Sequence, residues 1–259
     1  MSGMEYDAER RNSKTGSSEG KVSSTDASEQ HKSKFDSKTL TVPEQYHTNY
    51  MYNKTVSFLQ SVEGKTIKIT ALYIDIVNSS NKVKKLANEE TGAYYQTFIE
   101  DTSDLIQEHG GYVLKNVGDC VMGFFHASND HEKQDKAILC GLALRDTIKN
   151  SLNAYFMARG LPSIACRITA DFGSVAVVRI RSNGDYSAID VFGSPMNSAA
   201  KIQRYAKPDQ MVIGSNLFWQ LSRDSFEFKL LNQWDLIGKE TYEVYLVDRK
   251  NHTKRGDNN

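Results

Sequence analysis

The sequence predicts an α+β domain of ferredoxin-like type, with a βαββαβ core, helices on one face of a mainly antiparallel sheet, and extra C-terminal strands. Two observations lead to this fold class. Apolar strand-like runs and helix-like periodic segments alternate in the order β-α-β-β-α-β, and further short strands follow. The chain has 259 residues, and setting aside a polar N-terminal stretch leaves roughly 200, enough for one domain with a real core.

Composition separates this folded region from its flanks. Residues 1–43 contain nine serines, mixed charges and few large apolar side chains. Such a segment cannot offset its chain entropy by burial, so we expect a disordered tail. Residues 44–65 are expected to form a helical lead-in, residues 66–250 the folded domain, and residues 251–259 a disordered C-terminus.

Charge and cysteine content exclude several classes of protein. The 32 basic and 32 acidic residues balance, so no global field favours nucleic acid or an anionic membrane. Three cysteines without C-x-x-C spacing argue against a disulfide framework or structural zinc. Because the chain shows neither an apolar run of about 18 residues nor a signal-peptide core, we expect a cytoplasmic protein without a membrane span.

The first half of the folded region contains a predicted central strand. Residues 66–77 are β-branched and apolar, as in a buried strand, and a modest helix candidate at 46–62 precedes them. Asn78 to Asn81 offer N-caps for one long helix, which ends at His109-Gly110-Gly111. Residues 112–114 and 121–125 flank a Gly-Asp turn and predict a hairpin.

The second half continues with a long amphipathic helix at 133–157. Strands are expected at 163–169 and 175–180, joined through Ala170 to Gly173. Ser194-Pro195 then opens a helix, with Ser as the cap and Pro at its first position, and Lys207-Pro208 closes it. A short strand at 211–213 and a hairpin of 226–231 with 242–247 complete the domain.

Two carboxylates stand at strand ends. Asp75 follows the apolar run that begins at Ala71, and Asp119 follows Gly118 in the hairpin turn. Either could simply belong to a turn. If neighbouring strands bring the two together, they could hold two divalent cations, as phosphoryl-transfer sites do. The backbone N–H groups just after Asp75 could receive a phosphate.

Two further pairs of residues suit a nucleoside triphosphate. Lys115 lies in the hairpin, and Asp190 lies inside the apolar run 188–192, where an unpaired carboxylate is costly. A lysine donor with an aspartate acceptor matches the adenine edge. Asn197 and Lys201 are four residues apart on one helix face. There, asparagine could orient a ribose and lysine could neutralise charge growing on a phosphate.

Four stretches together carry a family resemblance: Tyr73 to Ser80, Gly110 to Asp119, Asp190 to Gly193, and Asn197 to Ile202. In this order and spacing they resemble the class III nucleotidyl cyclase family, the catalytic domain of adenylate and guanylate cyclases. The similarity runs from about residue 66 to residue 247.

The resemblance implies a head-to-tail homodimer with active sites at its interface and two Mg²⁺ or Mn²⁺ ions in each. It also implies that ATP is the favoured substrate and that cyclic AMP and pyrophosphate are the products. Its implied site residues are Asp75, Ile76 and Asp119 for the metals, Ile76, Asn78, Ser79 and Ser80 for the substrate, Lys115 and Asp190 for adenine, Asn197 for ribose, and Lys201 for the transition state.

The chain departs from the family pattern in two places. The family usually has arginine where Lys201 stands, and lysine lacks the planar guanidinium fork. The family also tends to place a lysine before the glycine of its last hairpin, where this chain has Ile237-Gly238. Lys239 is therefore an expected substitute for binding the triphosphate, and Arg179 and Arg181 are further candidates for phosphate contact.

Other functions remain open at this point. A related cyclase making cyclic UMP or CMP, as in bacterial antiphage defence, shares the scaffold but would be expected to lack the Lys115–Asp190 pair, and cyclic GMP is a further alternative that would favour glutamate at position 115. A non-catalytic dimer module that binds a nucleotide is an alternative of another class. A diguanylate cyclase is disfavoured because its Gly-Gly-Asp/Glu-Glu-Phe stretch is missing. Trp219 and Trp234 are interpreted as packing residues.

Overall fold

A computed structural model describes residues 48–127, 131–181, 187–235 and 241–250. The tail expected at 1–43, the C-terminus expected at 251–259, and Lys239 lie outside the described residues. Within the described ranges, none of the helices is both long and apolar enough to cross a membrane.

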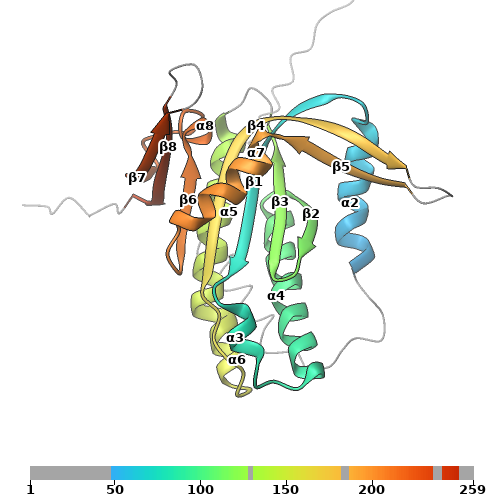
Figure 1. Cartoon of the computed structure of the whole chain (residues 1–259), viewed down its shortest axis with the longest axis vertical. Helices are drawn as coiled ribbons and strands as arrows, with labels where there is room; N and C mark the ends of the chain where they lie inside the picture. The colour runs from blue at the N-terminus through green and yellow to red at the C-terminus, as the bar shows by residue number, and fades with distance from the viewer. Residues whose placement is uncertain (1–47, 128–130, 182–186, 236–240, 251–259) are drawn as a thin grey trace, which may run out of the picture.

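The described elements confirm the predicted α+β class and the βαββαβ order of the core (Figure 1). In chain order they are α2 Thr48–Ser61, β1 Thr66–Ile76, α3 Ser79–Val83, α4 Asn88–Glu108, β2 Tyr112–Val117, β3 Cys120–His126, α5 His131–Thr147, the π-helix η1 Ile148–Leu152, α6 Asn153–Met157, β4 Cys166–Arg181, β5 Ser187–Gly193, α7 Ser194–Ile202, the 3-10 helix η2 Gln203–Tyr205, β6 Gln210–Gly214, α8 Ser215–Phe218, β7 Phe226–Asp235 and β8 Thr241–Arg249.

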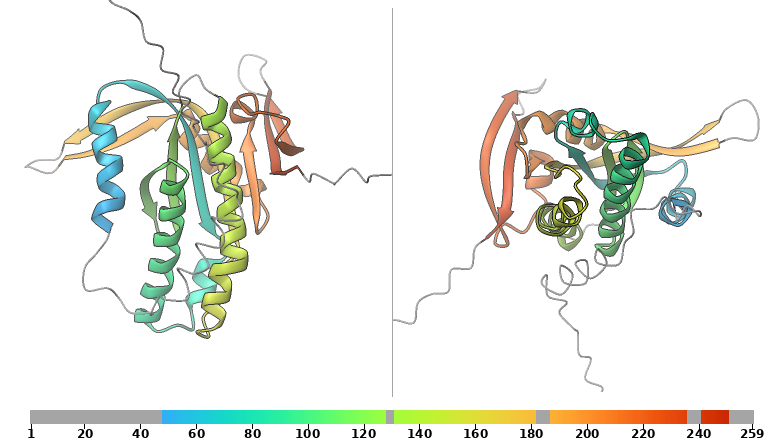
Figure 2. Two further views of the ribbon diagram at one scale, coloured as in Figure 1. Left: turned by 180° about the vertical axis from the view of Figure 1, so that it is seen from behind. Right: turned by 90° about the horizontal axis from the view of Figure 1, so that it is seen from below.

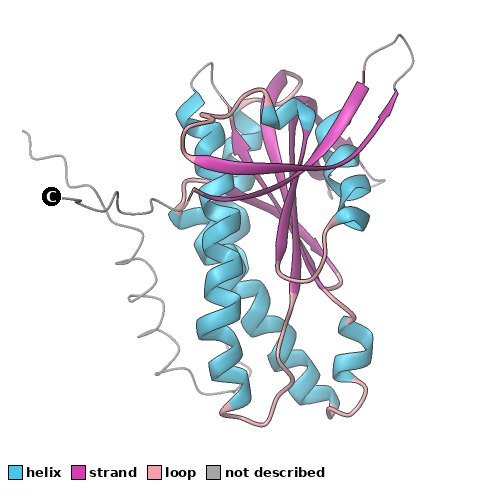
Figure 3. Ribbon diagram, turned by 90° about the vertical axis from the view of Figure 1, so that its left-hand side faces the viewer, coloured by secondary structure: helices cyan, strands magenta, loops and turns pink. Residues whose placement is uncertain are grey.

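Eight strands form one sheet in the order β2-β3-β1-β4-β6-β8-β7, with β5 paired to β4. Figure 3 shows the twist of the strands and the helices beside them. Most neighbours are antiparallel, and β4 with β6 is a parallel pair. Strand β1 lies inside the sheet, between β3 and β4, and eight of its eleven residues are buried. A strand buried on both faces needs cover on both, which decides where the helices lie.

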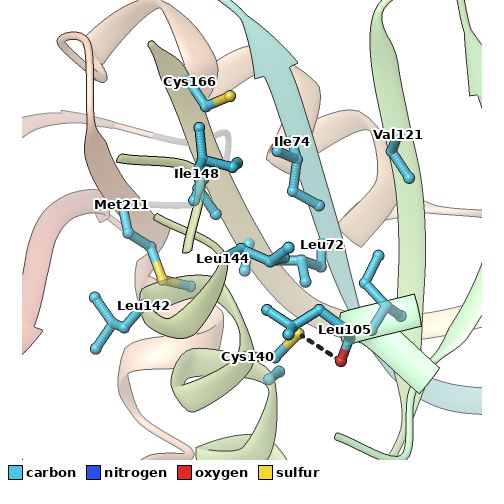
Figure 4. Packing of buried hydrophobic residues seen from close by; sticks show 14 of the residues in the cluster. Leu72, Ile74, Leu105, Val121, Cys140, Leu142, Leu144, Ile148, Cys166 and Met211 are labelled. Atoms are coloured by element: carbon cyan, nitrogen blue, oxygen red, sulfur yellow. Dashed lines mark hydrogen bonds between the residues drawn. The ribbon is translucent and has the colours of Figure 1, made fainter. Parts of the chain in front are cut away.

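The two faces of β1 pack against different helices. Leu72, Ile74 and Ile76 belong to the larger core, with residues of α4 and α5. Figure 4 shows Leu72 and Ile74 among Leu105 and Leu144 of these helices. The alternate residues Ile69, Ala71 and Tyr73 belong to a second core with residues of α2, α7 and β5. Figures 1 and 2 show α7 on one side of the sheet and α4 with α5 on the other. The expectation that helices cover only one face was therefore wrong.

The strands expected at 163–169 and 175–180 are one continuous strand, β4. The expected connection lies in its middle, where Ala170 to Gly173 pair with Leu72 to Ile69 of β1. Asp171 in this stretch is fully buried. Its carboxylate accepts hydrogen bonds from Tyr242 and from the start of α8. Because Tyr242 and α8 satisfy the buried carboxylate, the chain can continue as a strand through Asp171-Phe172-Gly173, which the sequence pattern predicted to be a turn.

The long helices are interrupted where the sequence predicted continuity. The segment after β1 forms two helices, α3 and α4, which are separated around Leu86. Asn78 occupies the N-cap position of α3, as expected, but it has a left-handed φ of 55° and its side chain makes no cap hydrogen bond. The helix expected at 133–157 runs from α5 into α6 through a π-helical turn. Helix α2 lies inside the expected 44–65 segment.

The last part of β5 leads directly into α7. Gly193, rather than Ser194, occupies the N-cap position, and Pro195 lies within the first two helical positions. Gly193 pairs with Val175 of β4, and a Cβ there would meet the Ser174 carbonyl oxygen and, at 2.9 Å, the Val175 Cα. The residue before α7 therefore has room for glycine alone.

We expect Gly193→Ala to lower the free energy of unfolding by about 2 kcal/mol, because backbone atoms must shift to admit the methyl group. Urea denaturation followed by circular dichroism measures this. The matched control is Gly92→Ala in α4, where a Cβ meets no atom within 4 Å and where alanine should stabilise the helix by up to about 1 kcal/mol. Equal effects of the two changes would contradict the packing argument.

Candidate active site

Asp75 and Asp119 meet at one end of the sheet. Asp75 lies near the end of β1, directly opposite Cys120 of β3. Asp119 is the residue just before Cys120, in the two-residue turn between β2 and β3. Gly118 opens that turn with a left-handed φ of 60°, which glycine adopts without strain. Sheet register therefore brings the two carboxylates together, as the sequence predicted for neighbouring strands.

The electrostatics of Asp75 reflect this proximity. Burial raises the pKa of its carboxyl group, and the nearby Asp119 carboxylate raises the pKa further. Arg167 on β4 opposes this, because its Nη2 lies 3.4 Å from Asp75 Oδ2. A pair of like charges at a half-buried position stabilises a bound cation and is costly without one.

The donor set of this pair fits a hard divalent cation. Mg²⁺ and Mn²⁺ prefer carboxylate and carbonyl oxygens, and Asp75 and Asp119 supply carboxylates. The Ile76 side chain is buried in the α4 and α5 core, so only its backbone could contribute. Among the described residues, no group of three or more His, Cys, Asp or Glu side chains could hold a metal ion. A metal here would therefore complete its coordination with water or substrate oxygens.

Lys115 and Asp190 form an ion pair across 75 positions of sequence. The Lys115 Nζ donates to Asp190 Oδ2 at 2.5 Å, and Asp190 Oδ1 accepts from the Val191 backbone N–H at 2.8 Å. Strands β2 and β5 supply the two residues, which remain partly exposed. The carboxylate in an apolar run is thus paired, as its cost in isolation requires.

Tyr73 is a buried residue of β1 near Asp75. It belongs to the second core with Val191, and Cys120 and Ile189 pack against that core. Burial raises the pKa of Tyr73 to about 12, with smaller contributions from Cys120 and Asp190. The sequence analysis assigned Tyr73 no role of its own, because an aromatic residue in a buried strand carries no separate signal.

Asn197 and Lys201 line a cavity of about 550 Å³ along one side of α7, with Ser194, Ser198 and Ala200. The ammonium of Lys201 lies over the ring of Trp234, 5.8 Å from its centroid. The i, i+4 spacing does place both predicted residues on the same cavity wall. Trp234 was interpreted as a packing residue, and it additionally faces Lys201.

The remaining predicted residues are placed as follows. Asn78 precedes α3, and Ser79 and Ser80 are the first two residues of that short helix, close in sequence to Asp75. The Arg179 guanidinium forms a two-pronged ion pair with Glu63, so the expected phosphate contact is already occupied. Arg181 is exposed at the end of β4.

Arg167 is a site residue that the sequence analysis missed. It meets Asp75 only because β1 and β4 pair in one particular register. No hydrogen bond or ion pair among the described residues joins the Asp75–Asp119 pair, the Lys115–Asp190 pair and the Asn197–Lys201 pair to one another. Within one chain, these three residue pairs are therefore three separate chemical groups.

A family model decides the identity of the domain. The model for the adenylate and guanylate cyclase catalytic domain matches residues 62–249, which includes all three groups. The chain belongs to this family. It therefore contains a class III nucleotidyl cyclase domain, and the predicted resemblance is confirmed.

Curated relatives of this cyclase domain differ in the base that their names specify. The chain is 31% identical over 151 residues to a uridylate cyclase of Rhodovulum sp. (strain MB263), a match that covers 52% of the chain and 58% of that relative. It is 24% identical over 194 residues to adenylate cyclase 1 of Rhizobium meliloti (strain 1021), covering 72% of the chain and 29% of the relative. The chain thus spans only part of the length of these relatives.

Solved structures confirm the fold of the cyclase domain. The adenylyl cyclase CyaB from P. aeruginosa superimposes with a TM-score of 0.65 at 19% identity, covering 73% of this chain and 97% of that one. At this identity the likeness concerns the fold alone.

Proposed function

We propose that this cyclase domain converts ATP to 3′,5′-cyclic AMP and pyrophosphate at the interface of a homodimer. The observation that carries the proposal is the ion pair between Lys115 and Asp190. The adenine edge offers a ring nitrogen that accepts a hydrogen bond beside an amino group that donates one. A lysine ammonium and an aspartate carboxylate complement these two groups.

The exposure of this pair leaves it available to a base. The side chain of Lys115 is 43% exposed, whereas that of Asp190 is 19% exposed. Asp190 is oriented by the Val191 N–H, so its carboxylate stays in place when the lysine moves. Lys115 can therefore turn toward a ring nitrogen while Asp190 accepts from the amino group.

The homodimer explains how three separate groups would act on one substrate. One subunit would supply Asp75 and Asp119, and the other Lys115, Asp190, Asn197 and Lys201. Large apolar side chains remain exposed near these positions, including Val117 at the end of β2 and Phe192 on β5. Such exposure on neighbouring hairpins is typical of surfaces that a partner covers.

The reaction forms one bond and breaks another. The ribose 3′-oxygen bonds to the α-phosphorus, the bond from that phosphorus to the bridging oxygen breaks, pyrophosphate leaves, and the hydroxyl proton passes to solvent. Asp75, Asp119 and the backbone of Ile76 would hold two Mg²⁺ or Mn²⁺ ions, which when bound acidify the hydroxyl and neutralise the triphosphate. Asn197 orients the ribose, and Lys201 stabilises charge growing on the phosphate.

The remaining proposed contacts concern the triphosphate. Asn78, Ser79 and Ser80 lie three to five residues after Asp75, and their backbone N–H groups and the serine hydroxyls are donors that suit phosphate oxygens. Lys239 stays a proposal from sequence alone.

Uridylate cyclase activity is the second candidate, favoured by the Rhodovulum relative. Although such a cyclase was expected to lack the Lys115–Asp190 pair, uracil presents a carbonyl acceptor beside a ring N–H donor, and the pair can complement these two groups as well. What separates the two bases is ring size, because a pyrimidine is smaller than a purine. The same pair of residues would then hold a smaller ring.

Product identification tests the proposal. The protein is incubated with ATP, GTP, CTP or UTP and Mn²⁺ or Mg²⁺, and products are identified by mass spectrometry. We expect cyclic AMP, lost in Asp75→Asn and reduced at least tenfold in Lys115→Gln through the missing base contact. Lys229→Gln, an exposed lysine on β7, is the matched control.

A product other than cyclic AMP would change the conclusion about the substrate. Cyclic UMP would establish the second candidate, whereas cyclic CMP or cyclic GMP would show that the domain does not prefer adenine, while the cyclase chemistry holds. A folded dimer that yields no product from any of the four nucleotides would favour a nucleotide-binding module without catalysis.

A further inference from the structure

Lys201 and Trp234 come from parts of the chain that meet only through the fold. Lys201 lies on α7 at the wall of the cavity. Trp234 lies near the end of β7, an edge strand of the sheet. The 5.8 Å between the ammonium and the indole centroid is within the range of a cation–π interaction.

The indole ring packs against two tyrosine rings. It stacks on Tyr242, with centroids 4.8 Å apart and planes 30° apart, and on Tyr205, with centroids 6.1 Å apart and planes 22° apart. Tyr242 is the direct cross-strand partner of Trp234. The Tyr242 hydroxyl donates to the buried Asp171 carboxylate at 2.6 Å, so the stack is anchored in the centre of the sheet.

Lys201 stands where the family usually has arginine, and its side chain needs a contact that restricts its conformation. The guanidinium fork of arginine is planar and pre-organised, whereas the ammonium of lysine sits on a flexible stem of four carbons. Without a partner, the stem would distribute over many rotamers and the charge over many positions. No hydrogen bond or ion pair of Lys201 to another described residue restricts it, and the Trp234 face is its contact in that part of the chain.

We propose that Trp234 is a positioning residue that holds the Lys201 ammonium at the cavity wall beside Asn197. This inference rests on the proposed cyclase function, because it concerns the charge that Lys201 supplies there. Trp234 acts through Lys201 and touches no substrate. The stack Tyr205–Trp234–Tyr242 thus supplies in this chain the order that an arginine fork supplies by its own geometry.

A spectroscopic test examines the contact without using activity. Trp219 and Trp234 are the only two tryptophans of the chain, so Trp219→Phe leaves Trp234 as the sole indole. In that background we expect Lys201→Gln to change the intensity or wavelength of Trp234 emission. Lys65→Gln, an exposed lysine before β1, should leave the emission unchanged. Unchanged emission in Lys201→Gln overturns the proposal, whatever the activity of the protein.

A kinetic cycle then tests the positioning role. We expect Trp234→Leu to lower kcat roughly fivefold with little change in KM, and Trp234→Phe to retain most of the activity. In a Lys201→Gln background, Trp234→Leu should produce no further loss. The matched control is Trp219→Leu, since Trp219 also lies beneath a cation, Arg223, at 4.4 Å, but away from α7.

The outcomes separate this proposal from the cyclase function. An equal loss from Trp234→Leu with and without Lys201 would assign the tryptophan to packing alone. Native-like circular dichroism of the leucine variant confirms that the comparison concerns folded protein, and Trp234→Phe provides the comparison if the leucine variant unfolds. If no nucleotide is turned over, the cyclase function and the catalytic part of this inference both fail, while the emission experiment still decides the contact.

Discussion

Replacing Asp119 by asparagine is expected to lower cyclase activity about a thousandfold or more while leaving the fold intact. The loss follows because one of two carboxylates that would bind the metals disappears, together with the charge stabilisation that they support. Asparagine is at least as well suited as aspartate to the turn after Gly118, so β2 and β3 should keep their pairing. Product formation by mass spectrometry and thermal unfolding provide the two measurements.

Asp119→Asn is not expected to lower the stability of the protein, although it lowers the activity. Asp119 raises the pKa of Asp75 by repulsion, so the pair is destabilising in the absence of a cation. Asp119→Asn should therefore leave the melting temperature unchanged or raise it slightly. Asp224→Asn, at an exposed turn position, should affect neither quantity. A variant that loses activity only by unfolding, or that keeps it, would contradict the role assigned to Asp119.

Asp171→Ala is expected to cause the largest loss of stability of any change considered, about 3 kcal/mol or more. The buried carboxylate accepts from Tyr242 at 2.6 Å and from the Leu217 N–H and the Asn216 amide at 3.2 Å each. Removing it leaves buried donors without partners, and each such group costs about 1–3 kcal/mol. Urea denaturation measures the free energy of unfolding. A loss of less than about 1 kcal/mol would contradict this account.

Asp171→Asn isolates the effect of the charge. Burial raises the pKa of Asp171, although the hydrogen bonds from Tyr242, Phe172, Asn216 and Leu217 oppose it. The native state therefore binds the proton more tightly than the unfolded chain, whose aspartate pKa is about 3.9. It follows that the stability of the protein relative to Asp171→Asn falls as pH rises through the interval above that value. Urea unfolding of both proteins from pH 4 to 7 measures the difference, and a rise with pH would contradict it.

Strands and turns with strong local signals could be predicted from the sequence. The apolar run ending at Asp75 is a buried strand, and Gly118-Asp119 is a tight turn, because burial pattern and turn chemistry are properties of adjacent residues. The helix carrying Asn197 and Lys201 was predicted for the same reason, and so was their common face. The family resemblance added roles for these residues that local patterns do not contain.

Elements that depend on distant partners could not be predicted. Ala170 to Gly173 resembles a connection, yet it forms the middle of β4 because Tyr242 and α8, 45 or more positions away, satisfy Asp171. The break between α3 and α4 and the π-helical turn at residues 148–152 were likewise not predicted, and only the structure shows them.

By itself, the sequence determined that the chain is an α+β cyclase domain with chemical groups at the ends of its strands. Only the tertiary structure decided which groups meet. The register of β1 with β4 places Arg167 next to Asp75. The pairing of β5 with β4 places Asp190 next to Lys115. The edge strand β7 places the ring of Trp234 beneath the Lys201 ammonium. Local patterns follow from the conformational preferences and burial of neighbouring residues. Contacts across the sheet follow from the packing of the whole chain, which no short segment encodes.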